Sequence, residues 1–482
     1  MAVLRLALVM DRIHDVDLPT ELWQEILSFC TSPEIAALAL VSQRFRAISR
    51  PLLFRSCTFR MRRHDKNRNC HQRLRLRLDF LTSPEIAPLL QDCVIQGCRR
   101  SKPEWIATIC ANLPLFPSLR RLDIRYLSIS SATVSALSNL TCQSSLLSLS
   151  LVRCGAGIAL PSGWEKHQGS ISVESFTSRQ YESAQGVDRW RFDLTSLNIA
   201  ALRHLDLGSR DSTKWLVMGF SPRTGTRFPN VETLHLHVRG LDDVPESNLI
   251  STLACFPSVR TLDIRAPHNY DRSRQAMHGP IGLPMDHLPA LQSFHGPARQ
   301  VVSYCRGRPS VRHLKLYGLR VSQTCKVAEL SPLLFGMGST STCAQIVSID
   351  LRIAMFVETI TSHMARIFPS LRALRMVVPR TGVPGVVYDF QRILDSMEAL
   401  ILSPALEVLF LAFRYDVDVN PWAHPNTSRF AKMEEAVRQL ASRFPALEHI
   451  CVCCDLGARA AGKRTRMWRW SRGLREEMVW AR

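Results

Sequence analysis

The sequence feature that most constrains the fold is a short apolar pattern that recurs along most of the chain. The pattern is apolar-x-x-apolar-x-apolar, and its clearest copies follow a Phe-Pro pair: FPSLRRLDI at 116, FPNVETLHL at 228, FPSVRTLDI at 256, FPSLRALRM at 368 and FPALEHICV at 444. Weaker copies begin at Leu90, Leu146, Leu202, Leu291, Val311, Ile346 and Leu406. A unit that recurs about every 30 residues is typical of solenoids, in which stacked repeats share one core.

The stretch between Leu146 and Leu202 interrupts this regularity, because these two copies lie two periods apart. We therefore expect one degenerate copy near residues 173–176. Other departures from the period predict loops or insertions, and these fall at residues 161–195, 209–227, 266–285 and 412–430.

The segments between the apolar copies predict helices. Met433, Val437 and Leu440 recur with helical spacing before one copy, and Ile360 and Met364 do so before another. The Phe-Pro pair ends the helix, because the residue before proline disfavours the helical conformation. Strands that alternate with helices pair in parallel through right-handed crossovers. The Leu-x-x-Leu-x-Leu core resembles leucine-rich repeats, which implies an α/β fold: an irregular solenoid with a curved parallel sheet on its inner face.

One column of side chains in such an array points away from the core. It holds the residue between the second and third apolar positions, since side chains alternate along a strand. We expect this concave column to contact a protein substrate through Asp123, Asp206, His235, Asp263, Lys315, Asp350, Arg375 and Phe410. The alternative is a solvated face of mixed charge, whose Asp and Arg residues pair at about 0 to 1 kcal/mol each.

A different pattern occupies residues 17–56, DLPTELWQEILSFCTSPEIAALALVSQRFRAISRPLLFRS. It predicts three short helices, because a proline, threonine or serine that suits a helix start precedes apolar residues at helical spacing. Leu22 and Ile26 lie on one stripe of the first helix, and Trp23 and Leu27 lie on a second. Three short helices cannot cover this much apolar surface, so we expect part of it to face a partner.

The order of these residues resembles the F-box, from Leu18-Pro19 through Val41-Ser42 to the trailing Arg-Pro-Leu-Leu-Phe. The resemblance implies that residues contacting a Skp-type linker protein, or forming the small core of the module, are Leu18, Pro19, Leu22, Ile26, Leu27, Val41 and Phe45. Phe45 departs from the family, which often has tryptophan at this position. The alternative is that these residues pack a helical cap onto the repeats.

The net charge of +20 is concentrated in two segments. Residues 55–77 hold nine Arg or Lys against one Asp, and residues 459–482 hold eight against two Glu. In the first segment a leucine stripe favours a helix, although the Arg/Leu alternation over residues 73–78 is typical of a strand. In the second, interleaved tryptophans favour a C-terminal helix that caps the last repeat, with nucleic-acid binding as the alternative.

Composition and motifs exclude several classes of function. Of the 15 cysteines, none has zinc-module spacing, and Cys70, His71, Cys93 and Cys98 match no closed site, so we expect reduced thiols and no metal. No catalytic or cofactor signature has supporting context, and no segment has the ~20 apolar residues of a membrane span. We expect a soluble, non-catalytic protein of the cytoplasm or nucleus, without cofactor or membrane partner.

These observations predict an N-terminal extension at 1–16, an F-box at 17–56, a basic connector at 57–89, a leucine-rich-repeat solenoid at 90–456 and a basic tail at 457–482. The combination resembles fungal-type F-box proteins with leucine-rich repeats. The resemblance implies a substrate-recognition adaptor of a cullin–RING ubiquitin ligase, bound to the cullin through the Skp-type linker. The alternatives are a ligase-independent repeat scaffold and a nucleic-acid-associated protein that uses the basic segments.

Overall fold

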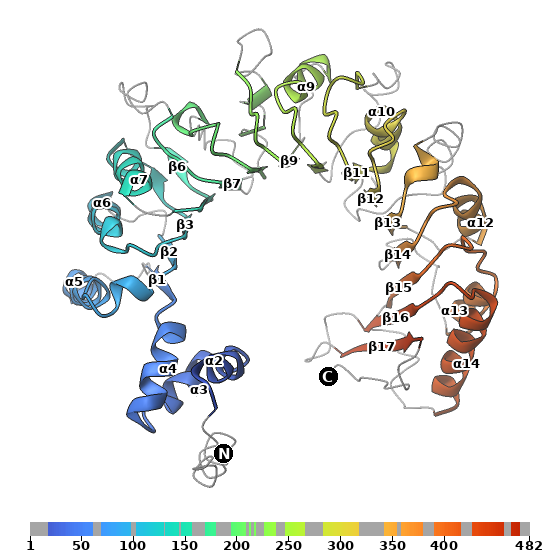
Figure 1. Cartoon of the computed structure of the whole chain (residues 1–482), viewed down its shortest axis with the longest axis horizontal. Coiled ribbons are helices and arrows are strands. Elements are labelled where there is room, and N and C mark those ends of the chain that lie inside the picture. The colour runs from blue at the N-terminus through green and yellow to red at the C-terminus, as the bar shows by residue number, and fades with distance from the viewer. Residues whose placement is uncertain are drawn as a thin grey trace. The chain divides into compact units, whose positions relative to one another are not determined.

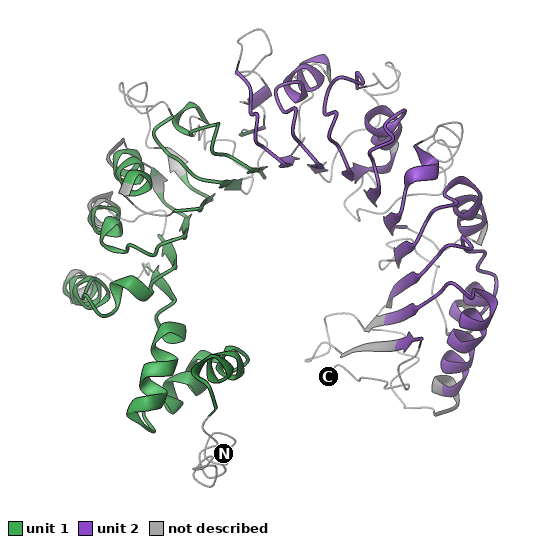
Figure 2. Cartoon of the chain, in the orientation of Figure 1, with its two compact units in different colours: residues 1–212 green, residues 213–482 purple. Residues whose placement is uncertain are grey.

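The structure is a computed structural model of the chain. It describes residues 18–60, 69–97, 103–129, 131–143, 146–156, 169–179, 194–208, 212–213, 216–217, 226–237, 246–265, 283–317, 342–353, 358–378, 390–415, 427–456 and 464–472. The chain divides into two compact units, unit 1 with residues 1–212 and unit 2 with residues 213–482 (Figure 2).

Unit 1 begins with three short helices, α2 (Thr20–Ser28), α3 (Ser32–Leu38) and α4 (Gln43–Leu53). Each starts where the sequence predicts it. A capping box opens α3, in which the backbone N–H of Thr31 donates to a carboxylate oxygen of Glu34 at 2.7 Å. The hydroxyl of Ser42 accepts the backbone N–H of Phe45 at 3.1 Å and opens α4. Their shared core consists of Leu27, Leu38 and Ile48.

The rest of unit 1 is a parallel sheet with helices on one side (Figure 1). Its strands, in spatial order, are β1 (Ser56–Arg60), β2 (Asp92–Gln96), β3 (Arg121–Arg125), β5 (Ser148–Val152), β7 (Ser175–Arg179) and β8 (His204–Leu207). A small second sheet pairs β4 (Ser128–Ile129) with β6 (Gly155–Ala156). The connecting helices are α5 (Asn69–Leu81), α6 (Pro103–Asn112) and α7 (Ser131–Gln143), with 3-10 turns at Ala87–Leu89, Leu113–Leu115 and Leu194–Ser196.

Unit 2 repeats this plan. Its parallel strands are β9 (Thr233–His237), β10 (Thr261–Arg265), β11 (Ser293–Pro297), β12 (His313–Tyr317), β13 (Ser348–Arg352), β14 (Ala373–Val378), β15 (Val408–Tyr415) and β16 (His449–Leu456), and β17 (Arg464–Ser471) follows antiparallel. Its helices are α9 (Glu246–Leu253), α10 (Val301–Cys305), α12 (Glu358–Ile367), α13 (Phe390–Glu398) and α14 (Thr427–Arg443), with 3-10 turns at Ala298–Gln300 and Cys343–Gln345. The strands line the inner side of this unit and the helices its outer side (Figure 1). The predicted fold class is confirmed.

A repeated backbone hydrogen-bond pattern joins each strand to the preceding one. The N–H groups of Gln91 and Asp92 both donate to the carbonyl oxygen of Arg55, at 2.8 and 3.0 Å. Other repeats use the same double donation, and the accepting residues are Arg55, Gln91, Arg120, Leu147 and Glu174 in unit 1 and Glu232, Arg260, Gln292, Arg312, Val347, Arg372 and Glu407 in unit 2. Because one carbonyl accepts two successive N–H groups, the register of each strand is fixed before its ladder begins.

Phenylalanines of the Phe-Pro pairs form part of the repeat core. Phe116, Phe228 and Phe256 have no exposed surface, and Phe368 is 1% exposed. The rings of Phe228 and Phe256, from consecutive repeats, stack with centroids 4.6 Å apart. Four of the five Phe-Pro phenylalanines are therefore buried in the repeat core, whereas Phe444 of the last pair is half-buried.

The structure confirms several predictions about single elements. The degenerate repeat is β7, whose Phe176 is fully buried, and the predicted helices before two repeats are α12 and α14. The leucine-rich part of the basic connector is a helix, α5, as favoured above. The connector also contains β1, which pairs with β2 in full register, so the sheet starts ahead of Leu90. The predicted insertions lie largely outside the described residues.

The prediction of a C-terminal capping helix is wrong, because residues 464–471 form strand β17, antiparallel to β16. Alternating basic and apolar residues in RTRMWRWS suit a strand better than a helix, and the unpaired side of β16 offers backbone partners. The tail therefore continues the sheet in the form of a strand, with Trp470 half-buried.

One buried cation holds a turn of unit 2 in place. Arg308 is 3% exposed, and its guanidinium donates to carbonyl oxygens of residues 283–288, including Pro284 at 2.5 Å and His287 at 2.6 Å. Burial lowers the pKa of Arg308 from its ordinary value. The carbonyl groups of this turn have no strand to pair with, and the guanidinium of Arg308 supplies the hydrogen-bond donors instead.

We expect Arg308→Met to lower the free energy of unfolding by roughly 2 to 4 kcal/mol, because it leaves buried carbonyl groups without donors. Denaturant unfolding measures the change, and Arg306→Met provides the matched control at an exposed arginine two residues away. Equal stabilities of the two variants would contradict the assigned role.

Candidate functional site

The helical module of unit 1 exposes an apolar stripe on α2. Leu22 is 45% exposed, Ile26 44% and Phe29 84%. Their spacing of four and three residues places them on one face of the helix. Apolar side chains in such a stripe are typical of a surface that another protein covers.

A second exposed apolar group lies at the turn between α3 and α4. Leu40 is 80% exposed and Val41 is 57% exposed. Of the other candidate residues, Leu18 is half-buried and Pro19 is exposed at the start of α2. Phe45 is half-buried, and its ring packs edge-on against Trp23 with centroids 5.1 Å apart.

Burial assigns Leu27 to the second of the two roles that the F-box resemblance leaves open, the core of the module. Leu27 is 1% exposed and belongs to the core of the module, so it is not available to a partner. Phe29 and Leu40 were missed among the candidates, although Phe29 continues the stripe of Leu22 and Ile26 in the sequence. For Leu40 no sequence signal separates an exposed leucine from the buried Leu38 two residues earlier.

The module packs against the first elements of the repeats in unit 1. An ion pair joins Arg50 of α4 to Glu85, and the rings of Phe54 and Phe80 lie edge-to-face with centroids 5.6 Å apart. Phe80 belongs to α5, so the basic connector contributes directly to this junction.

The second candidate surface is the predicted column on the inner face of the sheet, and the strand register confirms that its members line up. In unit 1, register pairs connect Asp123 through Ser150 and Thr177 to Asp206. In unit 2 the register connects, in order, His235, Asp263, His295, Lys315, Asp350, Arg375, Phe410 and Cys451.

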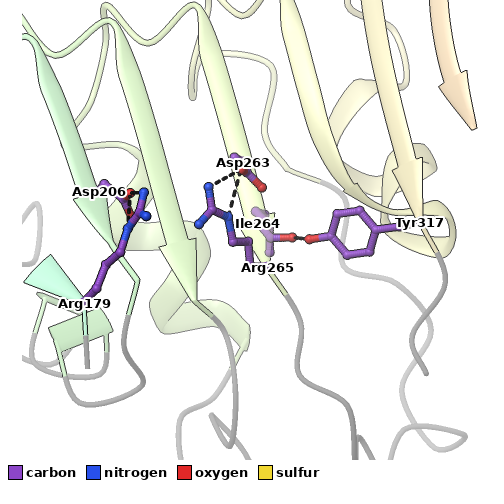
Figure 3. A network of polar contacts seen from close by, with 6 residues as sticks. All are labelled: Arg179, Asp206, Asp263, Ile264, Arg265 and Tyr317. Carbon is purple, nitrogen blue, oxygen red and sulfur yellow. Dashed lines mark hydrogen bonds and ion pairs between the residues drawn. The ribbon is translucent and has the colours of Figure 1, made fainter. Parts of the chain in front are cut away.

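The acidic residues of the column are neutralised by arginines of the same sheet. In unit 1, Arg179 donates to Asp206 at 2.5 Å, and Arg125 pairs with Asp123 (Figure 3 shows the former). In unit 2, Arg265 pairs with Asp263 at 3.0 Å (Figure 3), and Arg375 pairs with Asp350 at 3.3 Å. The last pair joins neighbouring strands, because Arg375 lies on β14 and Asp350 on β13.

In these four ion pairs the arginine is the more exposed partner. The arginine side chains are 39 to 52% exposed, whereas the aspartate side chains are 10 to 22% exposed. As whole residues, Asp206 is 7% exposed and Asp263 is 9% exposed. These aspartates therefore lie beneath guanidinium groups, which limits their direct contact with a substrate.

The remaining candidates differ in their surroundings. Lys315 and Arg375 are exposed, and the guanidinium of Arg375 lies over the ring of Phe410, 4.9 Å from its centroid. His235 is half-buried. In the same face, the hydroxyl of Tyr317 donates to the backbone carbonyl of Ile264, two strands away, and ties β12 to β10 (Figure 3).

One histidine of the column has a shifted pKa. Burial lowers the pKa of His295 from its ordinary value of 6.5, and the neighbouring charges of Lys315 and His235 lower it further. Asp263 and Asp350 act in the opposite direction without reversing the shift. The lowered pKa favours the uncharged form of His295.

The buried thiols of Cys110 and Cys154 are poor nucleophiles. Burial raises the pKa values of Cys110 and Cys154 to about 12. Cys93, one of the four metal candidates, is buried beside Cys57 on the neighbouring strand, whereas Cys98 lies outside the described residues. Among the described residues, no group of three or more His, Cys, Asp or Glu is arranged to hold a metal ion. No helix in this part of the chain is long and apolar enough to span a membrane.

Comparisons with known proteins support the N-terminal assignment. A family model for the F-box domain matches residues 16–56. F-box domains generally act as adaptors of ubiquitin ligases and bind Skp-type linkers. No curated protein matches the chain significantly.

A solved structure described as "Crystal structure of TLR13-ssRNA13 complex" is similar at 12% sequence identity, with a TM-score of 0.22. The match covers 72% of this chain and 61% of that chain, so this chain spans less than two thirds of it. The assignment of the repeat fold rests on the strand register given above.

The lowered pKa of His295 predicts a pH-dependent stability. Because the unfolded chain binds this proton more tightly than the folded chain, the free energy of unfolding should decrease as the pH falls below about 6.5. His295→Asn removes the titrating group, so the stability lost between about pH 7.5 and 5.5 should be smaller in the variant. Urea unfolding across this range measures it, and an equal or larger loss in His295→Asn would show that His295 is not responsible.

Proposed function

We propose that this protein is a substrate-recognition adaptor of a cullin–RING ubiquitin ligase. The F-box would bind a Skp-type linker and, through it, a cullin, while the repeats would bind a protein substrate. The chain itself would perform no catalysis, and it would act in the cytoplasm or the nucleus by holding a substrate near the ligase. The fungal type of the family remains a prediction from the sequence.

The single observation that carries the proposal is the exposed apolar stripe of α2 within a segment that matches the F-box model. Leu22, Ile26 and Phe29 expose large apolar side chains although the module has a core of its own. A partner that covers this stripe would remove apolar surface from water, which drives protein association.

The repeats support the second half of the proposal. Their inner face carries a register-aligned row of mostly polar side chains, in which Lys315, Asp350 and Arg375 follow one another on successive strands. Such a face is typical of repeat proteins that bind extended partners. A ligase-independent scaffold would use the same face, so cullin capture is the property that separates the two functions.

We expect Leu22→Asp to weaken capture of the Skp-type linker at least about tenfold, because it places a charge in an interface that excludes water. Phe29→Asp should act in the same way. Affinity capture of purified linker by the full chain, with detection of the cullin, measures the loss.

The matched control is Leu76→Asp, since Leu76 is 61% exposed on α5, outside the F-box. It should leave capture unchanged, and circular dichroism should show that all variants retain their helices. Undiminished capture by both Leu22→Asp and Phe29→Asp would refute the proposed linker surface. Linker capture without a cullin would favour the scaffold.

A further inference from the structure

On the inner face of unit 2, the cationic groups are more exposed than the carboxylates that they pair with. Its ion-paired aspartates are covered by their arginines, since the Arg265 side chain is 39% exposed against 13% for Asp263, and Arg375 is 52% exposed against 20% for Asp350. A molecule that approaches this face meets N–H donors before it meets carboxylates. The sequence places two Asp residues in the unit 2 part of the column, but it does not show that these carboxylates are less exposed than the arginines that pair with them.

One cation of this face has no carboxylate partner among the described residues. Lys315 on β12 is exposed and is in register with Asp350 on β13, but Asp350 accepts from Arg375 on its other side. Within the residues that the structure describes, Lys315 forms no ion pair. The positive charge of Lys315 acts on its neighbour on β11, where it helps to lower the pKa of His295.

The neighbours of Lys315 extend this cationic surface across three strands, β12 to β14. Arg352 is exposed at the end of β13, two residues after Asp350 and on the same side of the strand. Arg375 uses one amino group for Asp350 and covers the ring of Phe410 on β15. We refer to Lys315, Asp350, Arg352, Arg375 and Phe410 as the β12–β15 patch, which contains three cations and one anion.

We propose that the β12–β15 patch docks a carboxylate-rich segment of a partner protein. The complementary charge is the reason: a carboxylate near Lys315 would meet an exposed ammonium group, and the exposed guanidinium of Arg375 has N–H groups besides the one that donates to Asp350. If the adaptor function proposed above holds, this partner segment belongs to the substrate.

A nucleic acid fits the patch less well. Tight binding of a phosphate backbone needs several cations that release counterions, and base stacking needs an open aromatic face. Here one acid lies among the cations, and the guanidinium of Arg375 already covers Phe410. A peptide can place isolated carboxylates between these groups.

The test uses the full-length protein and a fluorescently labelled Glu-rich peptide, with the same peptide carrying Gln at each Glu as the neutral probe. Fluorescence anisotropy should show binding of the Glu peptide that weakens about tenfold or more in Lys315→Glu, while Lys315→Arg retains it. The matched control is Lys432→Glu on the outer helix α14, which makes the same change of charge at an exposed lysine away from the sheet. It should bind within about twofold of the unchanged protein.

The inference is overturned if Lys315→Glu and Lys432→Glu weaken binding equally, or if the Gln peptide binds as tightly as the Glu peptide. It is also overturned if single-stranded DNA binds more tightly than the peptide and loses that affinity in Lys315→Glu. Linker capture by Lys315→Glu is measured in parallel and should be unchanged. A chain that binds the peptide through Lys315 but captures no linker would refute the adaptor function and support the docking site.

Discussion

The structure depends on one backbone interaction: a single carbonyl oxygen that accepts two successive N–H groups of the following repeat. This arrangement recurs from Arg55 to Glu174 in unit 1 and from Glu232 to Glu407 in unit 2. Since it involves only main-chain atoms, it tolerates Arg, Gln, Leu, Glu or Val at the accepting position. The side chains are thus free to vary while the register, and with it the alignment of the inner column, is preserved.

The parts of the fold that were predictable are those that a periodic burial pattern determines. Phe176 belongs to a copy too degenerate to match the motif, yet the period alone located its strand. The prediction of a helix for the C-terminal tail was wrong because the repeat period carries no information on what covers the last strand of the sheet. Either a helix or a strand can bury tryptophans there. Alternation in RTRMWRWS was the local signal that favoured the strand.

The candidate surfaces were predictable to a lesser degree. The register of the column follows from the repeat, so the sequence placed the right residues in it. The exposed fraction of each side chain could not be predicted from the sequence. Asp206 and Asp263 are nearly buried because arginines of the same sheet cover them. Arg179 reaches Asp206 from the neighbouring strand, whereas Arg265 lies two residues after Asp263 on the same strand. Similarly, Leu27 and Ile26 are adjacent in the sequence, and only packing against α3 and α4 separates a core residue from an exposed one.

The reversal of direction at β17 has a consequence for how such an array changes during evolution. A repeat inserted between two parallel strands preserves the double donation on both sides, because each strand offers the same carbonyl to the next. A repeat added against the antiparallel β17 would meet hydrogen-bonding groups in a different order and would need a new crossover geometry. Duplication can therefore lengthen the array from within, whereas β17 fixes the position at which lengthening by simple repetition stops.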